Sequence, residues 1–322
     1  MKTQISKSFK DGNFSVLGIK FIQKNIPLMG FIALLIILSL MSSAFLTSYN
    51  ILSVLRQASI NGLIAFGMMF VILSSGIDLS VGSTLAFSSL IMAKMIQMGI
   101  PSPYAILISL LIGAIVGVIN GILISKGKLQ PMIATLSTMM VIRGLTLFIS
   151  NGVPVSKLGE GLIGWIGRGD FLNIPVPVYV LLIIFFIINF ILNRTVFGKR
   201  VYAIGGNSKA ARLSGIEVEK YLIYVYIFSG ILAALAGVIL TSRIDSAVPT
   251  AGISYEMNAI AAVVIGGASL TGGRGKVTGT LIGILIIAVL INGLNLLGTS
   301  AYLQQIITGL IIITAVIFDR KR

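Results

Sequence analysis

The chain has 322 residues, of which 56% are hydrophobic and 10% are charged, and its mean hydropathy is +1.04. Soluble domains normally carry about 25% charged residues, so this composition excludes a soluble domain and indicates an integral membrane protein. The formal net charge is +15, and the chain contains neither cysteine nor histidine. It therefore lacks disulfides, thiolate nucleophiles and imidazole bases or ligands, and we expect no metal site and no cofactor bound by this chain.

Ten apolar runs follow one another along the chain, and most approach the roughly 20 residues that a helix needs to cross about 30 Å of hydrocarbon. They are Leu28–Leu46, Ile51–Leu73, Leu79–Met98, Tyr104–Ile124, Met132–Ser150, Pro175–Leu192, Tyr221–Leu240, Met257–Leu270, Thr278–Leu297 and Tyr302–Phe318. Met257–Leu270 falls short of that length and is a candidate for a re-entrant or partly buried segment. The runs predict an all-α, polytopic membrane protein with about ten transmembrane or re-entrant helices.

Most of the basic residues lie in the tail over 1–25, at the C-terminus and in alternate connections between the runs. They are Lys2, Lys7, Lys10, Lys20, Lys24, Lys126, Lys128, Arg194, Lys199, Arg200, Lys209, Arg212, Lys220, Arg274, Lys276, Arg320, Lys321 and Arg322. Because positive charge accumulates in short cytoplasmic loops, both termini and the connection over 194–220 are predicted to be cytoplasmic. Contact with anionic membrane lipid explains the charge more simply than a nucleic-acid partner does.

The stretch GGNSKAARLSGI, Gly205 to Ile216, is a polar, helix-capable segment within the connection 194–220. Asn207 or Ser208 can cap a short helix that runs through Leu213, and Gly215 can end it in a left-handed conformation. Lys209 and Arg212 share one face, while Ala210, Ala211 and Leu213 offer compact apolar contact. Such a helix is suited to a groove in a soluble partner. The alternative is an ordinary basic cytoplasmic loop.

Five polar residues fall inside the apolar runs, where burying an amide or a charge in hydrocarbon is costly. They are Asn61, Asn120, Arg143, Asn292 and Asn295. Each is a candidate either for the lining of a passage or for a hydrogen bond to a neighbouring helix. Glycines also recur four residues apart, at Gly113, Gly117 and Gly121 and again at Gly279 and Gly283. We interpret that spacing as close helix packing.

Asp78, in the segment SSGIDLSVGS, is the only acidic residue between Asp11 and Glu160. Together with Ser80 it precedes an apolar run, as a helix N-cap does, and the ten-helix topology puts it in a cytoplasmic turn. We therefore expect a cap rather than a proton or sodium site. The glycine-rich segment Leu270–Val277 lacks the first glycine and the serine or threonine of a Walker A loop, so any ATP must bind another chain.

Four stretches resemble bacterial ABC-transporter permeases for monosaccharides, the ribose-type family. They are SSGIDLSVGS, YAIGGNSKAARLSGI, SAVPTAGISYEMNAIAAVVIGGASLTGGRGKVTGTLIG and INGLNLLG, and the resemblance runs from about Leu52 to Arg322. It implies a type II-like ABC importer permease domain over 26–322 in the bacterial inner membrane. It also implies that Asn207, Ser208, Ala211, Arg212, Leu213 and Gly215 belong to the coupling helix that seats in the ATPase subunit.

The same resemblance implies three protein partners: an ATP-hydrolysing subunit, an extracytoplasmic sugar-binding protein and a second copy of the permease. The main hypothesis is a permease, not an enzyme, for ATP-driven import of ribose or a similar monosaccharide. Another sugar of the same family, such as galactose, xylose or an autoinducer sugar, is the alternative. An ion-coupled carrier or an intramembrane enzyme should show a mid-membrane acidic or catalytic site, and the sequence shows neither.

Overall fold

The computed structural model describes residues 26–319, and the predictions on the tail 1–25 and on Arg320, Lys321 and Arg322 lie outside them. The helices are α2 (Ile26–Met41), α3 (Ser48–Leu73), α4 (Val81–Gln97), α5 (Ser102–Ser125), α6 (Pro131–Ser150), α7 (Leu162–Arg168), α8 (Val176–Arg194), α9 (Val196–Gly206), α10 (Ser208–Leu213), α11 (Val218–Ile244), α12 (Tyr255–Ile265), α13 (Val277–Leu296) and α14 (Ala301–Asp319). The strands are β1 (Val155–Ser156), β2 (Asp170–Phe171), β3 (Ile174–Pro175) and β4 (Ser246–Ala247).

Each of the ten predicted apolar runs overlaps one helix of this set. Six of these helices, α3, α5, α6, α8, α11 and α13, have the length and the apolar composition needed to cross a membrane. By the same criteria α2, α12 and the apolar part of α14 are shorter, and α4 has 17 residues. The all-α, multi-pass architecture is confirmed, whereas a count of ten full spans is not.

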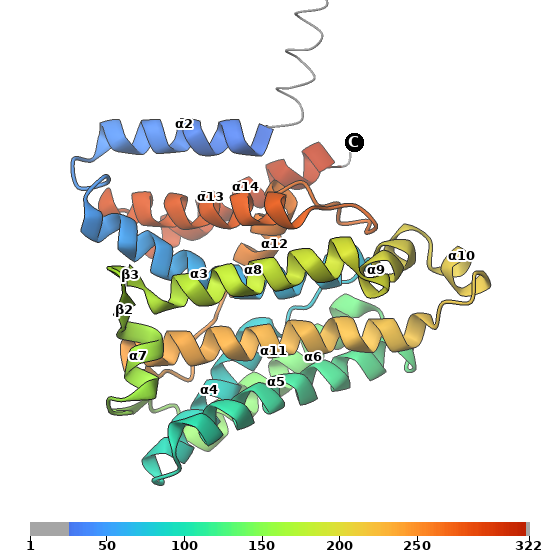
Figure 1. Cartoon of the computed structure of the whole chain (residues 1–322), viewed down its shortest axis with the longest axis horizontal. Coiled ribbons are helices and arrows are strands. Elements are labelled where there is room, and N and C mark those ends of the chain that lie inside the picture. The colour runs from blue at the N-terminus through green and yellow to red at the C-terminus, as the bar shows by residue number, and fades with distance from the viewer. Residues whose placement is uncertain (1–25, 320–322) are drawn as a thin grey trace, which may run out of the picture.

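Helix α3 forms the centre of the bundle, with α11, α12, α13 and α8 packed around it (Figure 1). Thr47 begins the helix as its N-cap and accepts a hydrogen bond from the Asn50 N–H. Every residue from Ala58 to Leu73 is buried. A helix that is apolar on all sides is stable only inside a protein or a membrane, so the composition of α3 accounts for its central position.

Small residues allow the helix backbones to approach closely, as their spacing predicts. A Cβ atom added to Gly117 of α5 would lie 2.3 Å from the Tyr226 carbonyl oxygen of α11. One added to Gly279 of α13 would lie 2.0 Å from the carbonyl oxygen of Gly266, just after α12. Neither position has room for a side chain. The interpretation of these glycines as packing residues is confirmed.

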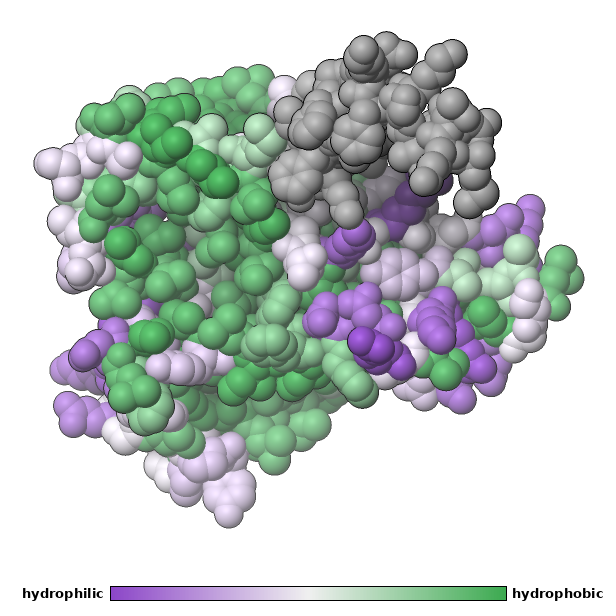
Figure 2. Space-filling view, turned by 45° about the horizontal axis from the view of Figure 1, so that its top comes forward, coloured by the Kyte–Doolittle hydropathy of each residue, from purple (hydrophilic) through white to green (hydrophobic). Residues whose placement is uncertain are grey.

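The polar parts of the molecule gather at its two ends. Figure 1 places α7 and the short strands β2 and β3 at one end, and α9 and α10 at the other. At the first end, β1 pairs with β4 and β2 with β3, both antiparallel, and Arg56 forms a 2.7 Å ion pair with Asp170. On the face that Figure 2 shows, hydrophobic residues cover the region between the ends, and hydrophilic residues gather at the end that bears α9 and α10. This distribution matches a protein inserted in a bilayer.

Candidate functional site

Helix α10 has the caps that the sequence predicts. The Asn207 side chain accepts a 3.0 Å hydrogen bond from the Ala210 N–H, so Asn207 is the N-cap and Ser208 the first helical residue. Gly215 follows the C-cap Ser214 with a φ of +81°, which glycine adopts without strain. These two residues therefore set the length of α10.

Of the three apolar residues of α10, Ala211 is buried, whereas Ala210 and Leu213 are exposed. Ala211 is only 5% exposed and packs with Ile204 and Val218 of the same chain. Leu213 is 90% exposed. Arg212 forms a 2.5 Å ion pair with Glu219 at the start of α11, which ties α10 to the bundle. Ala211 therefore anchors α10 to its own chain, and the Leu213 side chain projects away from that contact.

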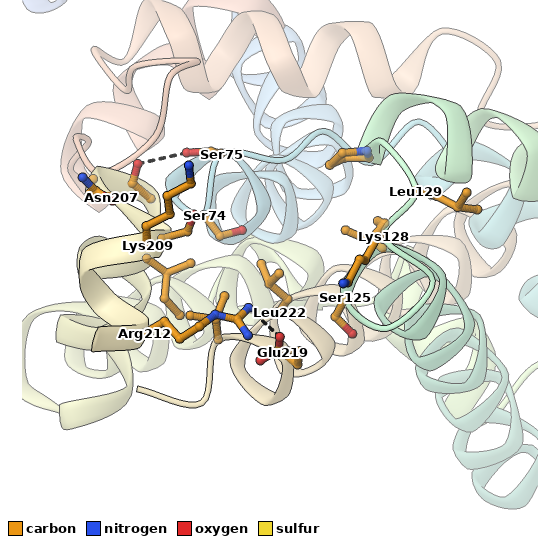
Figure 3. Close-up of a pocket in the computed structure, with 17 residues that line it drawn as sticks. Ser74, Ser75, Ser125, Lys128, Leu129, Asn207, Lys209, Arg212, Glu219 and Leu222 are labelled. Carbon is orange, nitrogen blue, oxygen red and sulfur yellow. Dashed lines mark hydrogen bonds and ion pairs between the residues drawn. The ribbon is translucent and has the colours of Figure 1, made fainter. Parts of the chain in front are cut away.

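A pocket of about 640 Å³ opens between α10 and the bundle. Figure 3 shows Asn207, Lys209 and Arg212 on one side of it, and Ser125 and Lys128, from the end of α5 and the turn after it, across from them. Three of its lining residues are basic and one, Glu219, is acidic. The pocket beside the candidate coupling helix therefore has a mixed polar and apolar lining with an excess of basic side chains.

The glycine-rich segment that follows α12 is bonded to the end of α3 and to α9. The Gly273 N–H donates to the Leu73 carbonyl at the end of α3 (3.0 Å), and the Ser75 hydroxyl donates to the Thr271 carbonyl (2.7 Å). The Tyr202 hydroxyl of α9 donates to the Gly275 carbonyl (2.9 Å), and burial raises the pKa of Tyr202. These contacts are those of a structural turn.

Asp78 lies inside the bundle, with an exposure of 1%. One carboxylate oxygen accepts from the Ser80 N–H (3.0 Å) and hydroxyl (2.6 Å), and the other from the Ser229 hydroxyl of α11 (2.8 Å). Ser80 is the N-cap residue of α4, yet its side chain makes no capping bond and instead accepts from the Asn120 amide (2.8 Å). The sequence places this pair in a cap within a cytoplasmic turn. In the structure Ser80 is the N-cap residue and both side chains are buried, with Ser229 donating to Asp78 and Asn120 donating to Ser80.

The other polar residues predicted at membrane depth do not converge on one site. Asn292 of α13 and Asn50 of α3 exchange two side-chain hydrogen bonds of 2.8 Å and 3.0 Å. Asn61 is buried within α3. Asn295 is exposed near the end of α13 and accepts from Gln304 (2.7 Å). Of the two roles that the sequence left open for Asn292, lining a passage or bonding a neighbouring helix, the structure shows the second.

Arg143 of α6 holds the segment between β4 and α12. Its Nη1 donates to the carbonyl oxygens of Pro249 (2.6 Å) and Ala251 (2.9 Å). The guanidinium also interacts electrostatically with Glu256 in the first turn of α12. Glu256, Ser229 and Asn50 were not among the residues that the sequence singled out. Only Glu256 carried a usable signal, as an acidic residue beside a short apolar run.

The family of transport-system permeases described as "Branched-chain amino acid transport system / permease component" matches residues 50–316. The chain belongs to this family. It is 54% identical over 301 residues to the ribose import permease protein of Bacillus subtilis, covering 93% of this chain and 94% of that protein. It is 45% identical to the ribose import permease protein of Escherichia coli K12, with coverages of 81% and 82%.

A third relative is the L-arabinose ABC transporter permease protein of Azospirillum brasilense, which is 37% identical, with coverages of 91% and 86%. No solved structure matches the chain. Membership of the family confirms the prediction of a multi-pass permease subunit of a bacterial ABC importer, not an enzyme. Such a permease works with a separate ATPase subunit and a binding protein.

Proposed function

We propose that this permease imports ribose, delivered by an extracytoplasmic binding protein and driven by ATP hydrolysis in a partner subunit. The observation that carries this proposal is the 54% identity to a ribose import permease over 93% of the chain. A second candidate is another monosaccharide, because a permease named for L-arabinose also matches over 91% of the chain. The difference in identity favours ribose.

In this proposal the end that bears α9 and α10 is cytoplasmic, together with both termini, and two copies of the chain form the permease. Basic residues gather at that end, in the connection over 194–220 and at Lys126 and Lys128, as the positive-inside rule expects. Helix α10 couples the permease to the ATPase. Its capped ends, its anchor at Ala211 and its exposed Leu213 support this role.

The test is import by the complete assembly in liposomes. The permease, its ATPase and the sugar-loaded binding protein are reconstituted, and ATP hydrolysis and uptake are measured for ribose, arabinose, xylose and galactose. Each sugar is presented by a binding protein that is saturated with it, so that differences report the permease. We expect ribose to be imported fastest. Equal or faster import of another sugar would reassign the substrate, and import without ATP would contradict the ABC mechanism.

A further inference from the structure

Helices α4 and α12 both begin inside the molecule, and their first turns meet. A Cβ atom on Gly82 would lie 2.1 Å from the Gly252 carbonyl oxygen, and one on Gly252 would lie 2.5 Å from the Gly82 oxygen. Gly252 also has a φ of +76°, which favours glycine. The backbone before α12 is therefore pressed against the first turn of α4 at a junction that tolerates no side chain.

This junction lies within the span of the helices rather than at either end of the bundle. Helix α6 has 20 residues, and Arg143 lies about 18 Å along it from Pro131 at 1.5 Å per residue. Glu256 lies about 14 Å from the C-terminal end of α12, and the turn that follows α12 is bonded to Leu73 at the end of α3. Both charged side chains are thus about 14–18 Å from the end that bears α10, and Arg143 is about 10 Å from the Ser150 end of α6, which puts them at membrane depth.

Arg143 and Glu256 bring opposite charges to the junction without closing into an ion pair. Among residues 26–319, no salt bridge involves Glu256, and every hydrogen bond of the Arg143 side chain uses Nη1. The Glu256 Oε2 atom lies 2.9 Å from the Cβ position of Gly82, directly at the start of α4. The carboxylate accepts from the backbone N–H groups of Ser254 and Glu256, and because two carboxylate oxygens can accept about four hydrogen bonds, it and the rest of the guanidinium retain bonding capacity.

Both side chains are only half-buried. A charged group at this depth is costly if it faces hydrocarbon and is normally directed to a water-filled cavity or to protein. Transporters also form substrate sites where discontinuous helices begin near the midplane. Ile253 and Met257 flank Glu256 and are 59% and 42% exposed, so apolar surface adjoins the polar groups, as in sites that bind small molecules.

We propose that Arg143 and Glu256 form a polar contact point for a neutral, polyhydroxylated sugar as it crosses the membrane. Glu256 accepts hydrogen bonds from sugar hydroxyls, and the free N–H groups of Arg143 donate to them. Arg143 also keeps the segment before α12 in position. This inference rests on the proposed function, because it requires a sugar to pass through this chain.

The experiment compares ribose with deoxyribose analogues that each lack one hydroxyl, using the complete assembly in liposomes and saturated binding protein. Glu256→Gln should lower ribose uptake at least about tenfold, since hydrogen bonds to charged groups are stronger than those between neutral groups. For at least one analogue, the loss caused by the missing hydroxyl in the wild type should disappear in the variant, because the two changes remove the same contact. Arg143→Lys should show the same non-additivity for a different hydroxyl.

Glu160→Gln is the matched control, because Glu160 is exposed in the segment between β1 and α7, and its uptake should equal that of the wild type. Thermal unfolding and co-purification with the ATPase identify any variant that fails to fold. If either Glu256→Gln or Arg143→Lys fails to fold, the other variant tests the proposed contact point. Unchanged ribose uptake, or additive losses for every analogue, would overturn the contact point alone. Failure of the wild type to import any of these sugars would overturn the proposed function.

Discussion

At the scale of single residues, the interior of this protein satisfies its polar groups in pairs and networks. Asn50 and Asn292 bond to each other across two helices, and Asp78 receives donors from Ser80 and Ser229. Lipid offers no hydrogen bonds to replace these contacts. The free-energy cost of breaking one of these hydrogen bonds therefore depends on which polar group is left buried without a partner.

Asn292→Leu should destabilise the protein, because it leaves the Asn50 side-chain oxygen buried without a donor. Interhelical hydrogen bonds in membranes contribute about 0.5–2 kcal/mol, and a loss of that size is expected in thermal unfolding of the detergent-solubilised protein. Asn50→Leu combined with Asn292→Leu should cost less than the sum of the single changes. Strictly additive costs would show that the two amides are not coupled.

Gly117→Leu should separate α5 from α11, because the new side chain would start 2.3 Å from the Tyr226 carbonyl oxygen. Overpacking of this kind typically costs about 1–3 kcal/mol, measured as a lower unfolding temperature. Gly30→Leu is the matched control, since no atom lies within 4 Å of a Cβ on this helical glycine. Equal effects of the two substitutions would refute close packing at Gly117.

At the scale of elements, α10 shows how a six-residue helix is held in a defined place. Isolated helices of this length are unstable in water. The Asn207 cap, the left-handed Gly215, the buried Ala211 and the Arg212–Glu219 ion pair hold it against the bundle. A helix with this much support presents its exposed residues in a fixed orientation, as docking requires.

Leu213→Asp should leave the permease folded, since the side chain is 90% exposed, yet reduce co-purification of the ATPase severalfold. Burying a carboxylate in an apolar groove is unfavourable, whereas Leu213→Met, the control, should preserve binding. Ala211→Glu is a different test. Because Ala211 packs against Ile204 and Val218, that change should disorder α10 itself. Normal ATPase binding by Leu213→Asp would show that α10 does not dock through this residue.

At the scale of the whole molecule, the polar ends and the apolar sides show how the bundle is oriented along the membrane normal. Only the distribution of basic residues indicates which of the two ends is cytoplasmic. The chain has no cysteine, so single cysteines report sidedness directly. Ser156, in β1, and Ser208, in α10, are exposed at opposite ends. Their positions make the proposed topology testable in intact cells.

Ser156→Cys should react with a membrane-impermeant maleimide in intact cells, and Ser208→Cys only after the membrane is permeabilised. The expectation follows from the basic residues that gather around α9 and α10, which the positive-inside rule assigns to the cytoplasm. The cysteine-free parent chain serves as the blank. Reaction of both cysteines from outside would exclude the proposed topology and, with it, the coupling role of α10.

Local patterns in the sequence were enough to predict the apolar helices, the caps of α10 and the packing glycines. Each depends on residues a few positions apart: apolar runs, Asn207 with Ala210, or glycines spaced by four. They were not enough for Ala211, because its burial depends on Ile204 and Val218, whose side chains meet it only after α9 and α11 fold around α10. The bond between Ser229 and Asp78 could not be predicted for the same reason, since Ser229 lies 151 residues further along the chain.

The sequence by itself determined that this protein is an all-α membrane permease, because hydropathy, the absence of cysteine and histidine, and family motifs are properties of the chain whatever its conformation. Only the tertiary structure decided that Asn292 bonds to Asn50, that Asp78 is enclosed, and that α4 and α12 begin against each other at Gly82 and Gly252. Such contacts join segments distant in sequence, and in a low-dielectric interior the nearest donor or charge decides what a polar group can do.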